Sequence, residues 1–214
     1  MADAGTLTAT FAPERLRRHG IRQVLDAADW GRLPETVRDR FADAAPDVTY
    51  GGAFELVRAS RLGKLFAWLG TLVGTPVVPR DGANVEARVR VRANRAGVEW
   101  RREYRWDDGT AHVVTSTKVV TPHGLVERLP ARLCMPLAVS EEQGVLVFTS
   151  RGYFFDLGWG LKLPLPAFFS PGVTRVEHVD LGHGWFRFTM LVMHPRFGEM
   201  FFQTGRFCAL EETP

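Results

Sequence analysis

The sequence is poor in cysteine and has no long apolar run. Cys134 and Cys208 lie far apart with no CxxC spacing, so we expect neither a metal cluster nor a redox pair and interpret both as buried free thiols. The longest apolar run, Leu65–Val73, is too short to span a bilayer. The first residues lack a basic segment followed by an apolar run, so we expect no signal peptide and a cytoplasmic protein.

Several functional signatures are missing as well. The chain has no GxSxG elbow, no GxGxxG sequence, no phosphate-binding GKS/T loop and no HxH or HExxH metal motif. Lysine occurs only at Lys64, Lys118 and Lys162, and the arginines that supply the other basic residues are interleaved with acids rather than gathered in a dense tract. We therefore expect no metal, no cofactor and no nucleic-acid partner.

The composition is that of an ordered globular protein. Of the 214 residues, 45% are hydrophobic and 11% are aromatic, which is enough to bury a substantial core. We predict a flexible tail over residues 1–12 and one domain over residues 13–214.

The first third of the chain has helical periodicity. Pro13–Ala28 and Pro34–Ala44 are predicted to be helices, interrupted at Asp29–Gly31. Phe54–Val73 has the longest pattern, with an apolar stripe opposite a basic face. We interpret it as a helix packed on a sheet. The alternative is an interfacial membrane helix, with Trp68 near its end.

After residue 85 the period changes from 3.6 to 2, which indicates strands. Turn signals such as Asn94–Gly97 and Pro122–Gly124 separate them. Helices over 13–73 followed by antiparallel strands over 85–210 predict an α+β fold, in which a curved antiparallel sheet or partial barrel packs on a long helix. The predicted strands are 85–92, 98–106, 112–121, 125–129, 144–153, 173–180, 185–194 and 199–210.

The strand at 98–106 places an arginine among large aromatics. Arg102 shares a face with Trp100, Tyr104 and Trp106, and an unpaired buried charge is costly. Glu127 likewise lies among apolar neighbours on its own strand. The two could form a structural salt bridge or lie in water at a strand edge. They could also line a polar spot in a pocket, where arginine binds a carboxylate or phosphate.

Three further residues could face the same cavity. Arg151 and Glu177 alternate with apolar side chains on their strands. His194 shares a face with apolar residues but precedes Pro195, so a strand-end histidine bonded to backbone is the simpler interpretation. The stiff apolar segment 158–166 is typical of the mouth or lid of a hydrophobic pocket, although packing of a long crossover loop explains it nearly as well.

Five short motifs follow one another along the chain. They are Trp30–Pro34 (WGRLP), Trp100–Tyr104 (WRREY), Gly124–Glu127 (GLVE), Leu163–Pro166 (LPLP) and His194–Gly198 (HPRFG) with Gly205. Through these motifs the chain resembles the bacterial domain of unknown function 4166 from about residue 30 onward. The family brings no established activity. Its members also occur attached to reductase-like, NAD-binding domains, so the resemblance implies an accessory or substrate-binding role beside a separate oxidoreductase.

Three hypotheses follow. The first is non-catalytic binding of a small, largely apolar molecule. Its walls would be Trp100, Tyr104 and Trp106, and Arg102 and Glu127 would orient its polar end. The second is an enzyme, or an accessory subunit of an NAD-dependent oxidoreductase, that uses Glu127 or His194 for acid–base chemistry. The third is an interaction or membrane-surface module that acts through residues 54–73. The predicted ligand-binding residues are Trp100, Arg102, Tyr104, Glu127, Arg151, Glu177 and His194.

Overall fold

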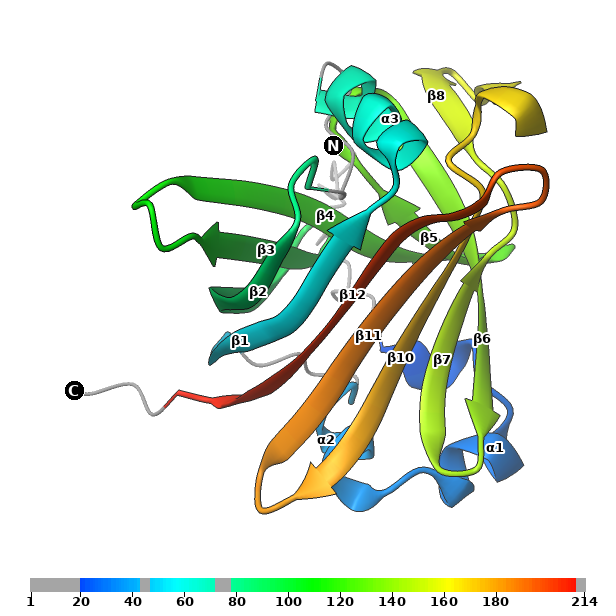
Figure 1. The fold of residues 1–214 in the computed structure, drawn as a ribbon. Helices are drawn as coiled ribbons and strands as arrows, with labels where there is room; N and C mark the ends of the chain where they lie inside the picture. The colour runs from blue at the N-terminus through cyan, green and yellow to red at the C-terminus, as the bar shows by residue number, and fades with distance from the viewer. Residues whose placement is uncertain (1–19, 43–46, 72–77, 211–214) are drawn as a thin grey trace, which may run out of the picture.

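A computed structural model of the chain describes residues 20–42, 47–71 and 78–210. Within these residues twelve antiparallel strands form one sheet, in the order β5-β4-β3-β2-β1-β12-β11-β10-β7-β6-β8-β9. A further pairing of β5 with β6 closes ten of the strands into a barrel (Figure 1). The hairpin of β8 and β9 lies outside this ring, and β8 pairs with the first residues of β6.

The elements have the following bounds. The strands are β1 (Val48–Ala59), β2 (Gly82–Asn94), β3 (Gly97–Arg105), β4 (Ala111–Thr121), β5 (Gly124–Arg128), β6 (Leu133–Glu142), β7 (Val145–Ser150), β8 (Phe154–Gly158), β9 (Leu161–Pro164), β10 (Val173–Gly182), β11 (Trp185–His194) and β12 (Gly198–Ala209). The helices are α1 (Ala27–Arg32), α2 (Glu35–Arg40) and α3 (Arg61–Thr71), with 3-10 turns η1 (Ile21–Gln23), η2 (Pro130–Arg132) and η3 (Ala167–Phe169).

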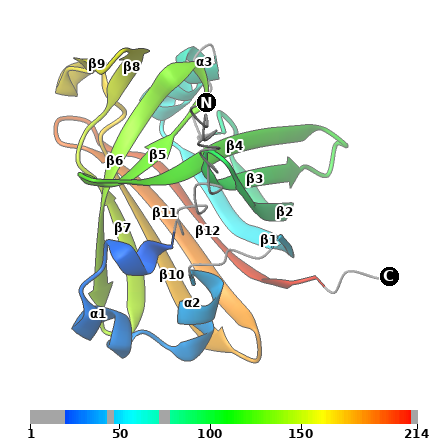
Figure 2. The ribbon, with the colours of Figure 1, turned by 180° about the vertical axis from the view of Figure 1, so that it is seen from behind.

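The barrel has two differently covered ends. The short helices α1 and α2 lie at one end, and α3 lies at the other together with the β8–β9 hairpin (Figures 1 and 2). The segment η3 also lies at the α3 end, because Phe168 of η3 contacts Phe197 in the turn that joins β11 to β12. We call these the α2 end and the α3 end.

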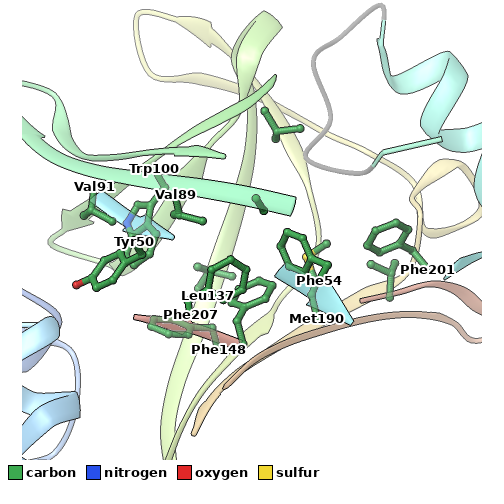
Figure 3. Packing of buried hydrophobic residues seen from close by; sticks show 14 of the residues in the cluster. Tyr50, Phe54, Val89, Val91, Trp100, Leu137, Phe148, Met190, Phe201 and Phe207 are labelled. Atoms are coloured by element: carbon green, nitrogen blue, oxygen red, sulfur yellow. The ribbon is translucent and has the colours of Figure 1, made fainter. Parts of the chain in front are cut away.

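Alternating side chains explain why the strands bury one face. On β2, Val85, Ala87, Val89 and Val91 are buried, whereas the charged residues between them are exposed. The same alternation on β3 buries Trp100, Arg102 and Tyr104, as predicted. The inward faces meet in one core, in which aromatic rings such as Phe54, Phe148 and Phe207 pack between strands (Figure 3).

The predicted α+β class is wrong, because the described residues form a mainly β fold without a long helix. The error is centred on Phe54–Val73. Its first part is the end of β1, Arg61–Thr71 is helical, and residues 72 and 73 lie outside the described residues. Ser60 marks the boundary, since its side-chain oxygen accepts a hydrogen bond from the Gly63 amide at 3.0 Å, as a helix N-cap does.

A β-bulge explains the helical spacing within β1. Its pairing with β12 shifts register between Phe54 and Leu56, so one extra residue is inserted there. Phe54 and Val57 consequently both point into the core although they are three residues apart, and Leu56 is exposed. A spacing of three is typical of a helix face, and a bulged strand reproduces it.

The predicted N-terminal helices are also largely wrong. The part of Pro13–Ala28 before residue 20 lies outside the described residues, and the rest contains only the turn η1 and the start of α1. The interruption predicted at Asp29–Gly31 is itself helical, within α1. The second predicted helix is confirmed only as the six-residue α2, and residues 43 and 44 lie outside the described part.

The predicted strands are confirmed, with ends that shift by a few residues. Strand β7 ends at Ser150 instead of continuing to Tyr153. The sequence pattern does not predict strands β1, β6, β8 and β9. The start of β6 buries Leu133, Cys134 and Met135 in succession, so it lacks the alternation that marks a strand.

Two smaller expectations concern the cysteines and the apolar segments. Cys134 and Cys208 are both free, the first buried and the second half-buried. In the ranges that the structure describes, no helix combines the length and the apolar character needed to cross a membrane.

The contact of α3 with the barrel gives a prediction about Gly63. A Cβ atom added there would overlap the carbonyl oxygen of Met200 on β12, so α3 would have to shift. Gly63→Ala should therefore lower the free energy of unfolding by about 1–3 kcal/mol, although alanine favours helices. Denaturant titration checks this, with the α1 variant Gly31→Ala as the control.

A Cβ atom at Gly31 would meet no atom within 4 Å, so Gly31→Ala should raise the stability by about 0.5 kcal/mol. Equal effects of the two substitutions would show that α3 does not pack against β12 as described.

Candidate functional site

A cavity of about 290 Å³ occupies the barrel interior. Its walls are mainly apolar and come from most strands of the barrel, from α3 and from the segment around η3. The lining residues are Gly63, Phe66, Ala67, Trp100, Arg102, Lys118, Glu127, Leu129, Leu133, Met135, Leu137, Phe148, Tyr153, Phe155, Leu165, Phe169, Pro171, Thr174, Val176, His178, Phe188, Met190, Val192, Met200, Phe201 and Gln203.

The cavity opens at the α3 end and is closed toward the α2 end. Phe169 of η3 lines the cavity and is itself 64% exposed, which marks the opening. At the opposite end the buried ring of Phe41, just after α2, contacts the rings of Trp100, Phe148 and His178 at centroid distances of 4.9–5.9 Å. The α2 segment therefore supplies a plug rather than a second entrance.

Three charged side chains from neighbouring strands meet in the cavity wall. Glu127 on β5 lies directly opposite Lys118 on β4, and Lys118 Nζ is 3.3 Å from Glu127 Oε1. Arg102 on β3 reaches the same carboxylate oxygen with Nη2 at 3.8 Å and donates from Nη1 to Ser116 Oγ at 3.2 Å. Each of the three charged side chains is only 8–11% exposed, so the group is buried as a unit.

The pKa values of this group follow from burial and from mutual charge. Burial alone raises the pKa of Glu127, but Lys118 and Arg102, with hydrogen bonds from Ser116 and Lys118, outweigh it and hold that pKa below its usual range. Burial lowers the pKa of Lys118, and Arg102 adds to this effect while Glu127 opposes it. Arginine stays charged in proteins. With Lys118 protonated, the group therefore carries two positive charges and one negative charge.

Aromatic rings surround the two cations. Lys118 Nζ lies 5.0 Å from the ring centroid of Trp100 and 5.7 Å from that of Phe148. The guanidinium of Arg102 is 6.0 Å from the same Trp100 ring. Such contacts stabilise a cation in part but are weaker than a full counter-charge. The indole nitrogen of Trp100 is buried and has no hydrogen-bond partner among the described residues, so it remains a donor.

His178 on β10 is a further titratable group in the cavity wall. Its ring lies among Phe41, Phe148, Phe186 and Phe188, and its Nδ1 has no hydrogen-bond partner within the described ranges. Burial, with repulsion from Arg40, Lys118 and Arg102, holds the pKa of His178 well below its usual value. The imidazole is therefore neutral at physiological pH.

Some of the predicted site residues lie in the cavity wall. Trp100, Arg102 and Glu127 line it together, and Arg102 and Glu127 are close enough to pair. Tyr104 is fully buried but is not in the lining. Its ring stacks on Phe54 at 4.9 Å, and its hydroxyl donates to Gln203 Oε1 at 3.2 Å. Tyr104 therefore packs in the core and lies outside the cavity lining.

The structure does not bring the other predicted residues to the cavity. Arg151 is exposed after the end of β7. Glu177 lies outside the lining and bonds Arg175 Nε at 2.8 Å. His194 is buried, and its Nδ1 accepts hydrogen bonds from the backbone amides of Arg196 and Phe197. This is the backbone-bonded strand end that the sequence also allowed, and it keeps His194 apart from the cavity lining.

The sequence contained a signal for one of the missed residues. Lys118 and Glu127 stand at equal distances from the two-residue turn Pro122–His123, so counting outward from this turn pairs them across the hairpin. His178 has no comparable signal, because both faces of β10 mix charged and apolar residues and alternation alone does not show which face is inward. Among the described residues, no group of three or more histidine, cysteine, aspartate or glutamate side chains could hold a metal ion.

The buried neutral His178 gives a prediction about acid stability. Below pH 6.5 an unfolded chain takes up a proton at this histidine while the folded chain does not, so stability falls as pH falls. This single group contributes a slope that approaches about 1.4 kcal/mol per pH unit. His178→Phe should remove that component from the pH dependence of urea unfolding between pH 7 and pH 5, the range in which the slope is to be measured.

The matched control is His123→Phe, at an exposed turn, which should keep the wild-type slope. A His178→Phe variant with the full wild-type slope would show that this histidine is accessible to protons in the folded protein.

The comparisons with known proteins give one match. Residues 33–207 match the family described as Domain of unknown function (DUF4166), and these residues include all the charged and aromatic groups of the cavity wall. No curated protein and no solved structure matches the chain. The match covers most of the sequence, and the chain belongs to the DUF4166 family.

Proposed function

We propose that the barrel is a non-catalytic binding protein for a small, largely apolar molecule that carries one anionic group. The observation that supports this most directly is the position of the Arg102–Lys118–Glu127 group in the wall of an otherwise apolar cavity. Cavities of this kind, with a few convergent polar groups, are the usual form of a small-molecule site. A volume of about 290 Å³ suits a single chain or ring system of modest size.

The charge of the group argues for an anionic ligand. One carboxylate faces two cations, so a protonated Lys118 leaves one positive charge without a partner. A buried charge without a counter-charge is costly, and a ligand carboxylate, sulfonate or phosphate would offset that cost. Arginine and lysine are also the side chains that bind such groups best.

Each residue then has a role in binding. Lys118 and Arg102 hold the anionic group. Glu127 fixes the positions of both cations through one of its two carboxylate oxygens, Oε1. Trp100 and Phe148 form the wall beside the cations, while the free indole N–H of Trp100 is available to donate to the ligand. The apolar part of the ligand extends toward the opening, among side chains such as Phe155 and Leu165.

Acid–base catalysis by Glu127 and His194 has less support. The lowered pKa of Glu127 keeps it ionised at neutral pH, which suits a counter-ion better than a proton donor. His194 uses Nδ1 for the turn backbone and lies outside the cavity lining. The separate oxidoreductase partner implied by the family resemblance stays a prediction.

Binding of dodecanoate and dodecanol tests the proposal. The two molecules have the same chain length and differ in the charge of the head group. We expect the wild-type protein to bind dodecanoate more tightly at pH 7.5, and Lys118→Met to weaken dodecanoate binding about tenfold without changing dodecanol binding. Isothermal titration calorimetry measures both affinities. Wild-type affinity for dodecanoate should also fall as pH rises and Lys118 loses its proton, at a lower pH than for an ordinary lysine.

Lys118→Met leaves Arg102 and Glu127 as a neutral pair, so the fold is expected to remain intact. Thermal unfolding of the variant checks this. Arg175→Met, which removes a cation that pairs on the outer face of β10, is the control and should bind both molecules as the wild type does. Equal losses for dodecanoate and dodecanol, or no loss for either, would contradict the role given to Lys118.

A further inference from the structure

The opening of the cavity is surrounded by exposed apolar side chains. We define the apolar rim as Leu65 of α3, Trp159, Leu161 and Leu163 of the β8–β9 hairpin, and Phe168 and Phe169 of η3. All six are exposed, and Trp159 is completely so. Because Phe169 also lines the cavity, the rim is continuous with the cavity wall. Exposed apolar surface of this extent usually marks an interaction site.

The tip of the β8–β9 hairpin carries a large aromatic residue where a two-residue turn usually has glycine or asparagine. Trp159 stands at its tip with a φ of 48°, in the left-handed region that large side chains rarely adopt. The hairpin lies outside the barrel ring and so extends the α3 end (Figure 2). Tryptophan and phenylalanine at a projecting tip are typical of side chains that settle at a membrane–water interface.

Cations accompany the rim. Arg61 begins α3, Lys162 lies between Leu161 and Leu163, and Arg196 precedes Phe197, whose ring contacts Phe168. All three are exposed, and none forms an ion pair within the described ranges. Of the acidic residues nearby, Asp81 pairs with Lys64 and Glu199 with Arg58, whereas Asp156 lies opposite Lys162 on the β8–β9 hairpin. With Asp156 counted against the three cations, the α3 end still combines apolar side chains with an excess of positive charge.

This combination selects one partner among three. A second copy of the chain would bring the same cations face to face, which is unfavourable. A protein partner would need acidic and apolar groups placed opposite these cations and the rim, and no feature of the described residues points to such a partner. An anionic bilayer supplies negative headgroups for Arg61, Lys162 and Arg196, and an apolar interior for the rim.

We propose that the α3 end docks onto an anionic membrane surface, with the apolar rim inserted among the headgroups and the cavity opening toward the bilayer. Docking of this kind does not require a bound ligand, so it goes beyond the proposed function. It also gives an amphipathic anion a path between bilayer and cavity that avoids water.

Sedimentation with vesicles tests the docking. The full chain is mixed at low ionic strength with vesicles made of equal parts phosphatidylcholine and phosphatidylglycerol, and with vesicles of phosphatidylcholine alone. We expect binding to the first, clearly weaker binding to the second, and loss of binding as salt rises. Trp159→Ser should weaken binding to the anionic vesicles about tenfold.

Trp185→Ser is the matched control. Trp185 is an exposed tryptophan that follows the β10–β11 turn, away from the α3 end, and its loss should leave vesicle binding unchanged. Equal losses for both variants, or failure of the wild type to bind anionic vesicles, would overturn the proposal. The protein could instead fail to bind vesicles and self-associate in a way that Trp159→Ser abolishes. That result would also overturn the proposal and would assign the rim to contact with a second copy of the chain.

The proposed membrane docking and the proposed ligand binding can be disproved independently of each other. Trp159→Ser should bind dodecanoate in solution like the wild type, because Trp159 does not line the cavity. Vesicle binding that depends on Trp159 in a protein that binds no dodecanoate would leave the docking intact and reject the proposed function. Dodecanoate binding without vesicle binding would do the reverse.

Discussion

A buried group of three charged side chains gives the otherwise apolar cavity of this barrel its charged region. Glu127 accepts from Lys118 and lies beside Arg102, and none of the three side chains is more than 11% exposed. Neighbouring strands β3, β4 and β5 supply one charge each, so the closed sheet determines the distances between them. Charges buried this deeply require partners. When Lys118 is protonated, the single carboxylate does not neutralise both cations, and this excess of positive charge is the basis of the proposed anion site.

Much of the fold follows from period-2 alternation, and most strands after residue 85 could be predicted from it. The predicted α+β class is wrong for two local reasons. The bulge in β1 places Phe54 and Val57 on one face with the spacing of a helix, so the pattern predicts one long helix where a strand precedes α3. The consecutive burial at the start of β6 hides the strand that pairs with β5 and closes the ring. The ring also depends on the pairing of β1 with β12, in which Tyr50 lies opposite Ala209, and no local pattern predicts a pairing between residues so far apart in the sequence.

The candidate site was predictable in part. An arginine and a glutamate on apolar strand faces indicated a pair, and both lie in the cavity wall. Strand parity alone failed for Glu177 and His178, because on β10 either face could be the buried one and the opposite choice exchanges the two residues. Tyr104 shows a different limit. Parity places it inward correctly, but whether an inward residue meets a cavity or packed rings depends on Phe54, which lies on a distant strand.

The central claim is that the cavity holds an anion beside Lys118 and Arg102, and carbon NMR tests it most directly. Dodecanoate labelled with carbon-13 at its carboxyl carbon is titrated with acid in the presence of excess protein. Two adjacent cations stabilise the ionised form, so the carboxyl pKa of the bound molecule should be lower than that of free dodecanoate. A bound carboxyl group whose pKa is raised would contradict the account, because it would place the head group in apolar surroundings away from the cations.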